Sequence, residues 1–152
     1  MSSPSSVPEK CIEESDGTKV TVKANGRVAT FLNPGKEKIK KIYVDCWLKS
    51  LPGLRSDFLL VNPETVDVII ELKGKDIDHA IKLILATLDH WKVLKHCSPR
   101  IGGLVVFTRS PERSATLDNL KLKLLDKHQI WIEMGKSGLR DYEFQTFTGT
   151  KR

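Results

Sequence analysis

The sequence predicts an α/β fold, in which helices flank a mixed central β-sheet and a β-hairpin lies on its N-terminal side. Up to residue 74, short β-prone runs are separated by turn residues; from residue 76 onward, helical and strand-like periods alternate. Helices that alternate with strands pack on the faces of a sheet. The chain has 152 residues, the length of one domain. We expect a flexible arm over residues 1–16, which are rich in Ser, Pro and Glu, and a single domain over residues 17–152.

The first half of the chain predicts strands separated by turns. An apolar run around Val20 and another over residues 28–32 are separated by Asn25-Gly26, which is typical of a β-hairpin. Three further strands are expected over residues 42–45, 57–61 and 67–72, with turns at Pro52-Gly53 and at residues 62–65. These three strands would form an antiparallel meander.

The second half predicts helices and strands in alternation. Apolar residues at steps of three and four predict an amphipathic helix over residues 76–95. An apolar strand is expected over residues 101–108, a second helix from Ser110-Pro111-Glu112 onward, and a last strand over residues 129–134. Alternating aromatic residues at Tyr142, Phe144 and Phe147 are compatible with an edge strand in the tail.

Charge is unevenly distributed along the chain. Lys and Arg number 25 against 19 Asp and Glu, for a formal net charge of +6. Residues 35–56 are strongly basic, residues 57–74 hold four acidic side chains and one lysine, and residues 75–152 are basic again. An acidic spot within a basic chain suits a cation site inside a surface that binds a polyanion.

The cysteines and the apolar runs bear on compartment. Cys11, Cys46 and Cys97 are odd in number, far apart and form no Cys-x-x-Cys pair, so we expect reduced thiols and no disulfide. Apolar runs such as residues 58–61 fall far short of the roughly 20 residues of a membrane span. The expected location is cytoplasmic, without membrane contact.

Ionisable residues at the end of a hydrophobic hairpin carry the chemistry. In a strand, residues two apart share a face, so Glu71 and Lys73 share one face of the strand over residues 67–72 and its extension. If Val61 faces Asp67 across the turn, Asp57 faces Glu71, at about 5 Å between Cβ atoms. Two such carboxylates repel each other unless a divalent cation lies between them, and hard oxygen ligands favour Mg²⁺ or Mn²⁺.

Asp57, followed after thirteen residues by Glu71-Leu72-Lys73 on a hairpin that precedes a long helix and a strand, resembles the PD-(D/E)XK nuclease superfamily. The resemblance covers residues 36–134 and implies the restriction-endonuclease-like fold with its βββαβ core. It also implies that Asp57, Glu71 and the Leu72 carbonyl bind Mg²⁺ or Mn²⁺, and that Lys73 positions the attacking water. Ser56 stands where the superfamily motif has proline.

Several further residues are candidates for supporting roles. Asp67 could replace Asp57 as a metal ligand, although solvation in the turn is the favoured interpretation. Asp45 and Glu37 are candidates for positions beside the metal ligands. Phosphate contacts are expected from basic residues on both sides of the acidic interval: Lys36, Lys38, Lys40, Lys41, Lys49, Arg55 and Lys75.

The sequence therefore predicts a Mg²⁺-dependent phosphodiesterase acting on nucleic acid, a DNA endonuclease in preference to a ribonuclease. The alternative is a catalytically silent module of the same fold that binds nucleic acid or protein. Because 17.1 kDa is small for a sequence-specific nuclease acting alone, a homodimer or a larger protein complex is the expected assembly.

Overall fold

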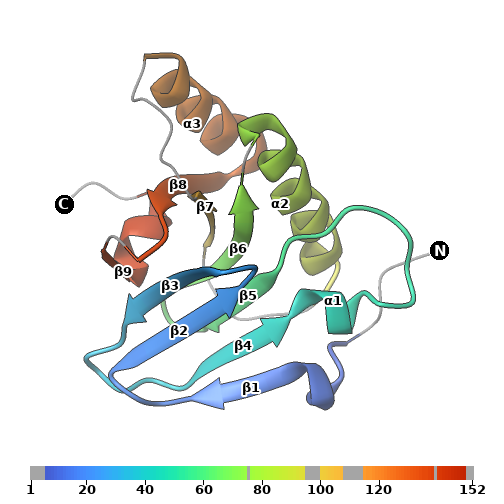
Figure 1. The fold of residues 1–152 in the computed structure, drawn as a ribbon, viewed down its shortest axis with the longest axis vertical. Helices are drawn as coiled ribbons and strands as arrows, with labels where there is room; N and C mark the ends of the chain where they lie inside the picture. Colours follow the sequence, from blue (N-terminus) through green and yellow to red (C-terminus); the bar gives the residue numbers. More distant parts are fainter. Residues whose placement is uncertain (1–5, 75, 95–99, 108–114, 139, 150–152) are drawn as a thin grey trace.

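The computed structural model describes residues 6–74, 76–94, 100–107, 115–138 and 140–149, and has an α/β architecture built on two sheets (Figure 1). The six-stranded sheet has the order β1-β4-β5-β6-β7-β8, and the smaller sheet has the order β2-β3-β9. The strands are β1 (Ile12–Ser15), β2 (Lys19–Ala24), β3 (Arg27–Leu32), β4 (Ile39–Tyr43), β5 (Phe58–Asn62), β6 (Val66–Gly74), β7 (Ile101–Phe107), β8 (Ile130–Lys136) and β9 (Asp141–Glu143). The helices are α1 (Val44–Trp47), α2 (Ile77–Lys92) and α3 (Ala115–His128), and 3₁₀ turns occur at η1 (Glu9–Cys11) and η2 (Phe144–Thr148).

The large sheet is mixed, as the sequence predicts. Strands β1, β4, β5 and β6 pair in antiparallel fashion, whereas β6, β7 and β8 are parallel. The predicted β2–β3 hairpin is also present, and its turn residues Asn25 and Gly26 have φ values of 56° and 73°. Both residues therefore adopt the left-handed conformation that a two-residue type I′ turn requires.

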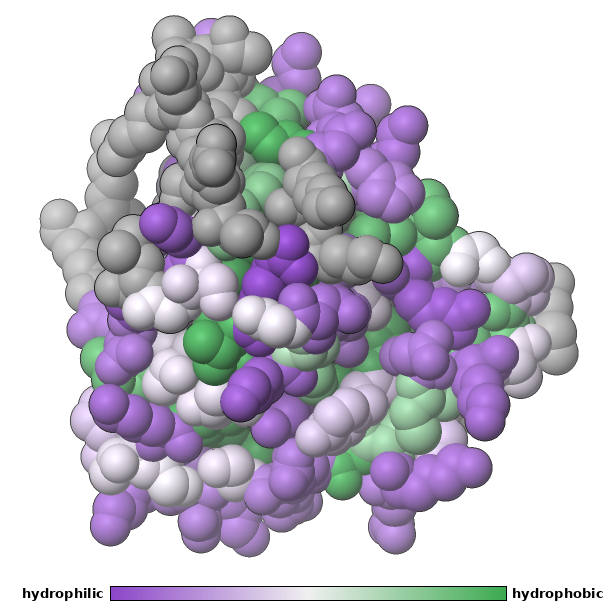
Figure 2. All heavy atoms as spheres, viewed as in Figure 1, coloured by the Kyte–Doolittle hydropathy of each residue, from purple (hydrophilic) through white to green (hydrophobic). Residues whose placement is uncertain are grey.

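The β5–β6 hairpin is covered on both faces, as its uninterrupted apolar runs predict. Leu59 and Ile69 belong to the hydrophobic core that α2 covers, whereas Phe58 and Ile70 belong to a second core beneath the β2–β3 sheet. Strand β2 alternates exposed with buried residues, so one of its faces is exposed and the other packs on the core. Figure 2 shows mostly hydrophilic side chains along the edges of the visible surface, with smaller hydrophobic areas between them. Helix α2 begins after Asp76, whose carboxylate accepts hydrogen bonds from the N–H groups of Asp78 and His79.

The N-terminal segment differs from the predicted flexible arm. Residues 12–15 form β1, which pairs with β4 from Ile12 opposite Ile42 to Ser15 opposite Ile39. Within this pair, Glu13 forms an ion pair with Lys41 at 3.3 Å. The arm expectation therefore fails for residues 9–15, because a short strand of mixed polarity can complete the edge of a sheet.

The prediction of a strand through residue 45 is also wrong. Strand β4 ends at Tyr43, and residues 44–47 form α1. Val44 and Trp47 are three residues apart, so a helical turn buries both, with exposures of 0% and 2%. Asp45 consequently lies on the solvent side of a helical turn.

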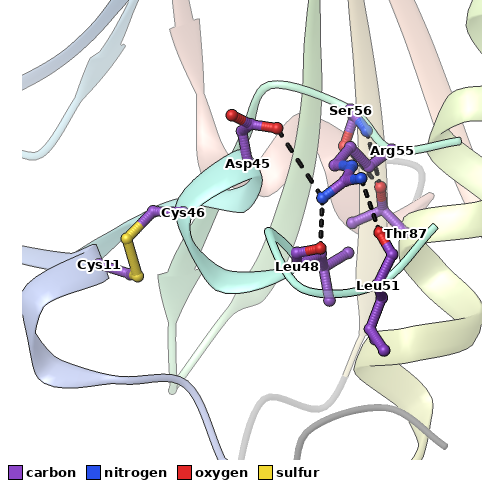
Figure 3. Close-up of polar contacts among 8 residues, drawn as sticks. All are labelled: Cys11, Asp45, Cys46, Leu48, Leu51, Arg55, Ser56 and Thr87. Atoms are coloured by element: carbon purple, nitrogen blue, oxygen red, sulfur yellow. Dashed lines mark hydrogen bonds and ion pairs between the residues drawn. A yellow bond between two sulfur atoms is a disulfide. The ribbon is translucent and has the colours of Figure 1, made fainter. Parts of the chain in front are cut away.

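The prediction of reduced thiols throughout is wrong as well. Cys11 and Cys46 form a disulfide that joins η1 to α1, with the Cα atoms 5.5 Å apart (Figure 3). They are 35 residues apart in sequence, and only the pairing of β1 with β4 brings them together. Because Cys11 and Cys46 are paired, the cysteines no longer support the expectation of a cytoplasmic location.

The expectations for the C-terminal half are confirmed in part. The helix over residues 76–95 and the strands over 101–108 and 129–134 are confirmed with small shifts of their ends, whereas the start of the second helix at residues 110–112 lies outside the described residues. In the tail, only residues 141–143 form a strand, and Phe144 and Phe147 lie in η2. Within the described part of the chain, each helix is too short or too polar to cross a membrane.

Candidate active site at the open end of the β5–β6 hairpin

The register of the hairpin agrees with the sequence prediction. Val61 lies opposite Asp67, and Phe58 lies opposite Ile70. The paired residues end at Phe58, and Asp57 directly before it donates its N–H to the Ile70 carbonyl. Asp57 and Glu71 thus lie at the same end of the hairpin, away from its turn, and their predicted facing lies one step beyond the paired residues.

Asp57 is half-buried at the entry to β5 and is bound from two sides. Its carboxylate Oδ2 accepts a hydrogen bond from the Leu72 N–H at 2.8 Å, and its own N–H donates to the Ile70 carbonyl at 3.1 Å. Its carbonyl oxygen accepts from the Val44 N–H at 3.2 Å. Asp57 is thereby fixed relative to β6 on one side and to the start of α1 on the other.

Glu71 is 4% exposed and shares the α2 side of the sheet with Ile69. It pairs with Val105 of β7, but the register shifts before the next pair, Gly74 with Phe107. The shift inserts one extra residue into β6, as in a β-bulge, where backbone groups leave the regular ladder. The Glu71-Leu72-Lys73 triplet begins at this irregularity.

Leu72 and Lys73 complete the triplet that begins with Glu71. Leu72 is fully buried in the core beneath the β2–β3 sheet, so its side chain points away from Glu71. The backbone of Lys73 belongs to β6. The side chain of Lys73 lies outside the described part of the structure, as does the whole of Lys75.

These residues fit a hard divalent cation. Two carboxylates and a backbone carbonyl are the oxygen donors that Mg²⁺ and Mn²⁺ prefer. Among the described residues, no group of three or more His, Cys, Asp or Glu side chains could hold a metal.

Asp45 and Arg55 lie close to this end of the hairpin but engage each other (Figure 3). The Arg55 guanidinium is 3.8 Å from the Asp45 carboxylate, whose side chain is 90% exposed. The same guanidinium donates to the carbonyl of Leu48 and, at 2.8 Å, to that of Leu51. Arg55 thus closes the turn that follows α1. Of the predicted phosphate contacts, Lys49 is exposed on this same turn.

The basic run ahead of β4 is not gathered at this site. Lys40 pairs with Val61, four residues along β5 from Asp57, which corresponds to about 13 Å. Lys41 donates to the Thr21 carbonyl at 2.8 Å besides its ion pair with Glu13. Lys36 and Lys38, also predicted to contact phosphate, precede β4 and lie still nearer the turn end of the hairpin.

Glu37 belongs to a cavity at that turn end. Its backbone N–H donates to the Asn33 Oδ1 at 3.2 Å, and its carbonyl accepts from the Asn33 Nδ2 at 2.8 Å. A cavity of about 380 Å³ is lined here by residues that include Asn33, Glu37, Asn62 and Thr65. Glu37 therefore lies at the opposite end of the hairpin from Asp57 and Glu71.

Asp67 corrects another expectation. It is fully buried rather than solvated in the turn, and its Oδ2 accepts a hydrogen bond from the Trp91 indole N–H at 2.8 Å. It shares the α2 side of β6 with Ile69 and Glu71 but lies four residues from Glu71. Alternation along the strand predicts that Asp67 and Glu71 share a face. It does not predict the contact with Trp91, which depends on how α2 packs on the sheet.

Sequence reasoning also missed Ser56 and Thr87, which contact each other directly ahead of Asp57 (Figure 3). The Ser56 N–H donates to the Thr87 Oγ1 at 2.8 Å, and the two hydroxyl oxygens are 2.9 Å apart. Thr87 is itself tied to its helix, since its hydroxyl donates to the Leu83 carbonyl at 3.1 Å. Its place on the apolar side of α2 was the only signal in the sequence.

A further polar group lies at the β1–β4 edge beside the site. The Tyr43 hydroxyl donates to the Glu13 carboxylate at 2.9 Å. This hydrogen bond, with help from Lys41, lowers the pKa of Glu13, whereas burial and then the Glu13 contact raise the pKa of Tyr43. Tyr43 pairs with Phe58, the residue after Asp57, so this edge abuts the candidate site.

In comparisons with family models, curated proteins and solved structures, the chain shows no significant similarity to any of them. Its function is therefore inferred from the residues and the geometry of this site.

Proposed function

We propose that the chain is a Mg²⁺- or Mn²⁺-dependent nuclease that hydrolyses phosphodiester bonds of nucleic acid, with internal cleavage of DNA as the expected activity. The supporting observation is the open end of the β5–β6 hairpin, where Asp57 lies at the entry to β5 and the buried Glu71 lies on β6 beside an irregularity of the ladder. The order β4, β5, β6, α2, β7 agrees with the resemblance to the PD-(D/E)XK superfamily.

Two carboxylates at the open end of the hairpin suit a divalent cation. Glu71 is buried on β6, and Asp57 is half-buried at the entry to the neighbouring strand β5. A divalent cation between two carboxylates relieves their repulsion, and hard carboxylate oxygens are the ligands that Mg²⁺ and Mn²⁺ prefer.

The residues divide the chemistry between them. Asp57, Glu71 and the Leu72 carbonyl would hold the cation, which when bound supplies positive charge to stabilise a phosphodiester under attack. Lys73 would orient the attacking water through its ammonium group. Hydrolysis then adds that water across one P–O bond, giving a phosphomonoester end and a hydroxyl end.

One observation favours the alternative, a binding module that does not cleave. Lys36, Lys38 and Lys40 lie toward the turn end of the hairpin, about 13 Å or more from Asp57, so they do not surround the candidate site. A nucleic acid or an acidic partner could bind there without reaching the carboxylates. For cleavage at the carboxylates, a second copy of the chain or a larger complex would have to supply the phosphate contacts that these lysines do not make there.

A cleavage assay distinguishes these functions. Plasmid DNA, single-stranded DNA and RNA are incubated with the protein and Mg²⁺ or Mn²⁺, beside Glu71→Ala and Lys73→Ala. The matched control is Asp67→Asn, a carboxylate of the same strand that lies outside the site and retains an oxygen to accept the Trp91 N–H. We expect the wild type and the control to cleave, and both site variants to be inactive.

Three results would contradict the nuclease proposal. Cleavage that survives both site substitutions would show that these residues do not carry the activity. Binding of nucleic acid at low salt without cleavage would support the silent module. Absence of binding to all three substrates would exclude the nuclease and the nucleic-acid-binding module, and leave only a module that binds protein.

A further inference from the structure

The residue that precedes Asp57 is held by a neighbouring helix. Ser56 is 2% exposed and Thr87, on α2, is fully buried, so their contact is shielded from water. The Thr87 Oγ1 accepts the Ser56 N–H, lies 2.9 Å from the Ser56 hydroxyl, and donates to the Leu83 carbonyl. A proline at position 56 would have no N–H to donate, so serine permits an anchor that proline would remove.

Asp57 lies directly before its strand, at the point where the chain enters the hairpin. Strand β5 begins at Phe58, and the Asp57 N–H donates to the carbonyl of Ile70, the partner of Phe58, while its carboxylate accepts the Leu72 N–H. These contacts are made on the β6 side, and the buried Ser56 anchors the backbone that leads into Asp57 to α2 on the other. Arg55 holds the preceding turn against the carbonyls of Leu48 and Leu51 (Figure 3).

We propose that Thr87 is a positioning residue for the candidate metal ligand Asp57, acting through its hydrogen bonds to Ser56. This inference rests on the proposed function for its consequence, metal binding, but concerns a geometric relation that can be measured separately. Groups that orient a metal ligand without touching the metal typically change metal affinity or activity by about 10–100-fold when they are removed.

The key variant is Thr87→Val, which retains the shape of the side chain and removes its hydroxyl. Thr87→Ser is the conservative variant, since it retains the hydroxyl and should retain function. Ser56→Ala is a milder test that removes one hydroxyl contact and retains the backbone N–H. Leu88→Ala controls for general destabilisation, because it makes a cavity in the core next to Thr87 without touching Ser56.

Two measurements are made at a temperature where every variant is folded. The first is Mn²⁺ affinity by titration calorimetry, which we expect to fall by about 10–100-fold in Thr87→Val and to stay near wild type in Thr87→Ser and Leu88→Ala. The second is hydrogen exchange of the Leu72 N–H, which donates to the Asp57 carboxylate, relative to the Ile69 N–H in the same strand. We expect this ratio to rise at least about tenfold in Thr87→Val, with a smaller rise in Ser56→Ala.

The outcomes separate the two proposals. An unchanged exchange ratio in Thr87→Val, or an equal change in Leu88→Ala, would overturn the positioning role. If the wild type binds no Mn²⁺, the metal site of the proposed function fails, while the exchange ratio still decides whether Thr87 positions Asp57. If Thr87→Val shifts the ratio but binds Mn²⁺ with wild-type affinity, positioning of a metal ligand is likewise refuted.

Discussion

Each end of the β5–β6 hairpin has a buried carboxylate on β6, but the surroundings of the two carboxylates differ. Near the turn, Asp67 is fully buried in a regular ladder, pairing with Val61 on one side and Ile101 on the other, and it accepts the Trp91 indole N–H. At the open end, Glu71 is almost as buried, but the register of β6 against β7 shifts directly after it and a second carboxylate lies across the hairpin. Burial alone therefore does not distinguish a structural carboxylate from a candidate ligand.

The two ends also differ in what holds them. The turn end is fixed by consecutive strand pairs. The open end is held by contacts from outside the hairpin: the disulfide at the base of α1, the Arg55 contacts and the Ser56–Thr87 pair. An end that is irregular in hydrogen bonding and fixed by other elements is the kind of place where a protein holds reactive groups in defined positions.

Removing the disulfide should have the largest effect on stability. In the chain-entropy model, a cross-link between residues 35 apart stabilises the folded chain by about 3–4 kcal/mol. We expect Cys11→Ala/Cys46→Ala to lower the free energy of unfolding in urea by that amount, and reduction of the wild type to do the same. Equal stability of the oxidised and reduced protein would show that the β1–β4 pairing alone secures this edge.

Removing one charge from each end tests the comparison directly. Glu71→Gln, which preserves shape, should reduce Mn²⁺-dependent cleavage by at least about 100-fold, the upper range for groups that only support a metal ligand. Asp67→Asn should retain cleavage. Single-turnover rates on plasmid DNA measure both. A similar loss in the two variants would mean that both carboxylates serve the fold and that the comparison between the two ends does not hold.

The sequence predicted the register of Val61 opposite Asp67 because side-chain alternation has a period of two and the turn is short. The facing of Asp57 and Glu71 stays a prediction, since the paired residues end at Phe58. It could not reveal that Asp67 is buried against Trp91, since that contact depends on how α2 lies across the sheet. It also missed the helical turn after Tyr43, which buries Val44 and Trp47, and the Cys11–Cys46 link, which accompanies the pairing of β1 with β4. The sequence also grouped Lys40 with the candidate site, whereas Lys40 pairs with Val61, toward the turn end of the hairpin. The position of a charge in the sequence does not give its position along paired strands.

The Asp67 hydrogen bond should be separable from activity. Trp91→Phe retains most of the aromatic core and removes the indole N–H donor, so the buried carboxylate loses a charge-assisted hydrogen bond. We expect a loss of about 1.5–3 kcal/mol in the free energy of unfolding, with cleavage per folded molecule unchanged. Thermal or urea unfolding beside the plasmid assay provides both values. Cleavage that falls more than stability explains would place Trp91, and with it the turn end, in the function.

The smallest expected effect lies at the edge beside Asp57, where pH reports on the contact of Tyr43 with Glu13. Because the pKa of Glu13 is lowered below its ordinary value of 4.5 in the folded state, the contact stabilises the protein above that pH and ceases to do so as pH falls through the lowered value. Tyr43→Phe retains the ring contact with Phe58 and removes the hydroxyl. We expect it to be less stable than wild type by under about 1 kcal/mol near pH 6, since Glu13 is exposed, and the difference to shrink toward pH 3. A difference that grows on acidification would assign the pH response of this edge to another group.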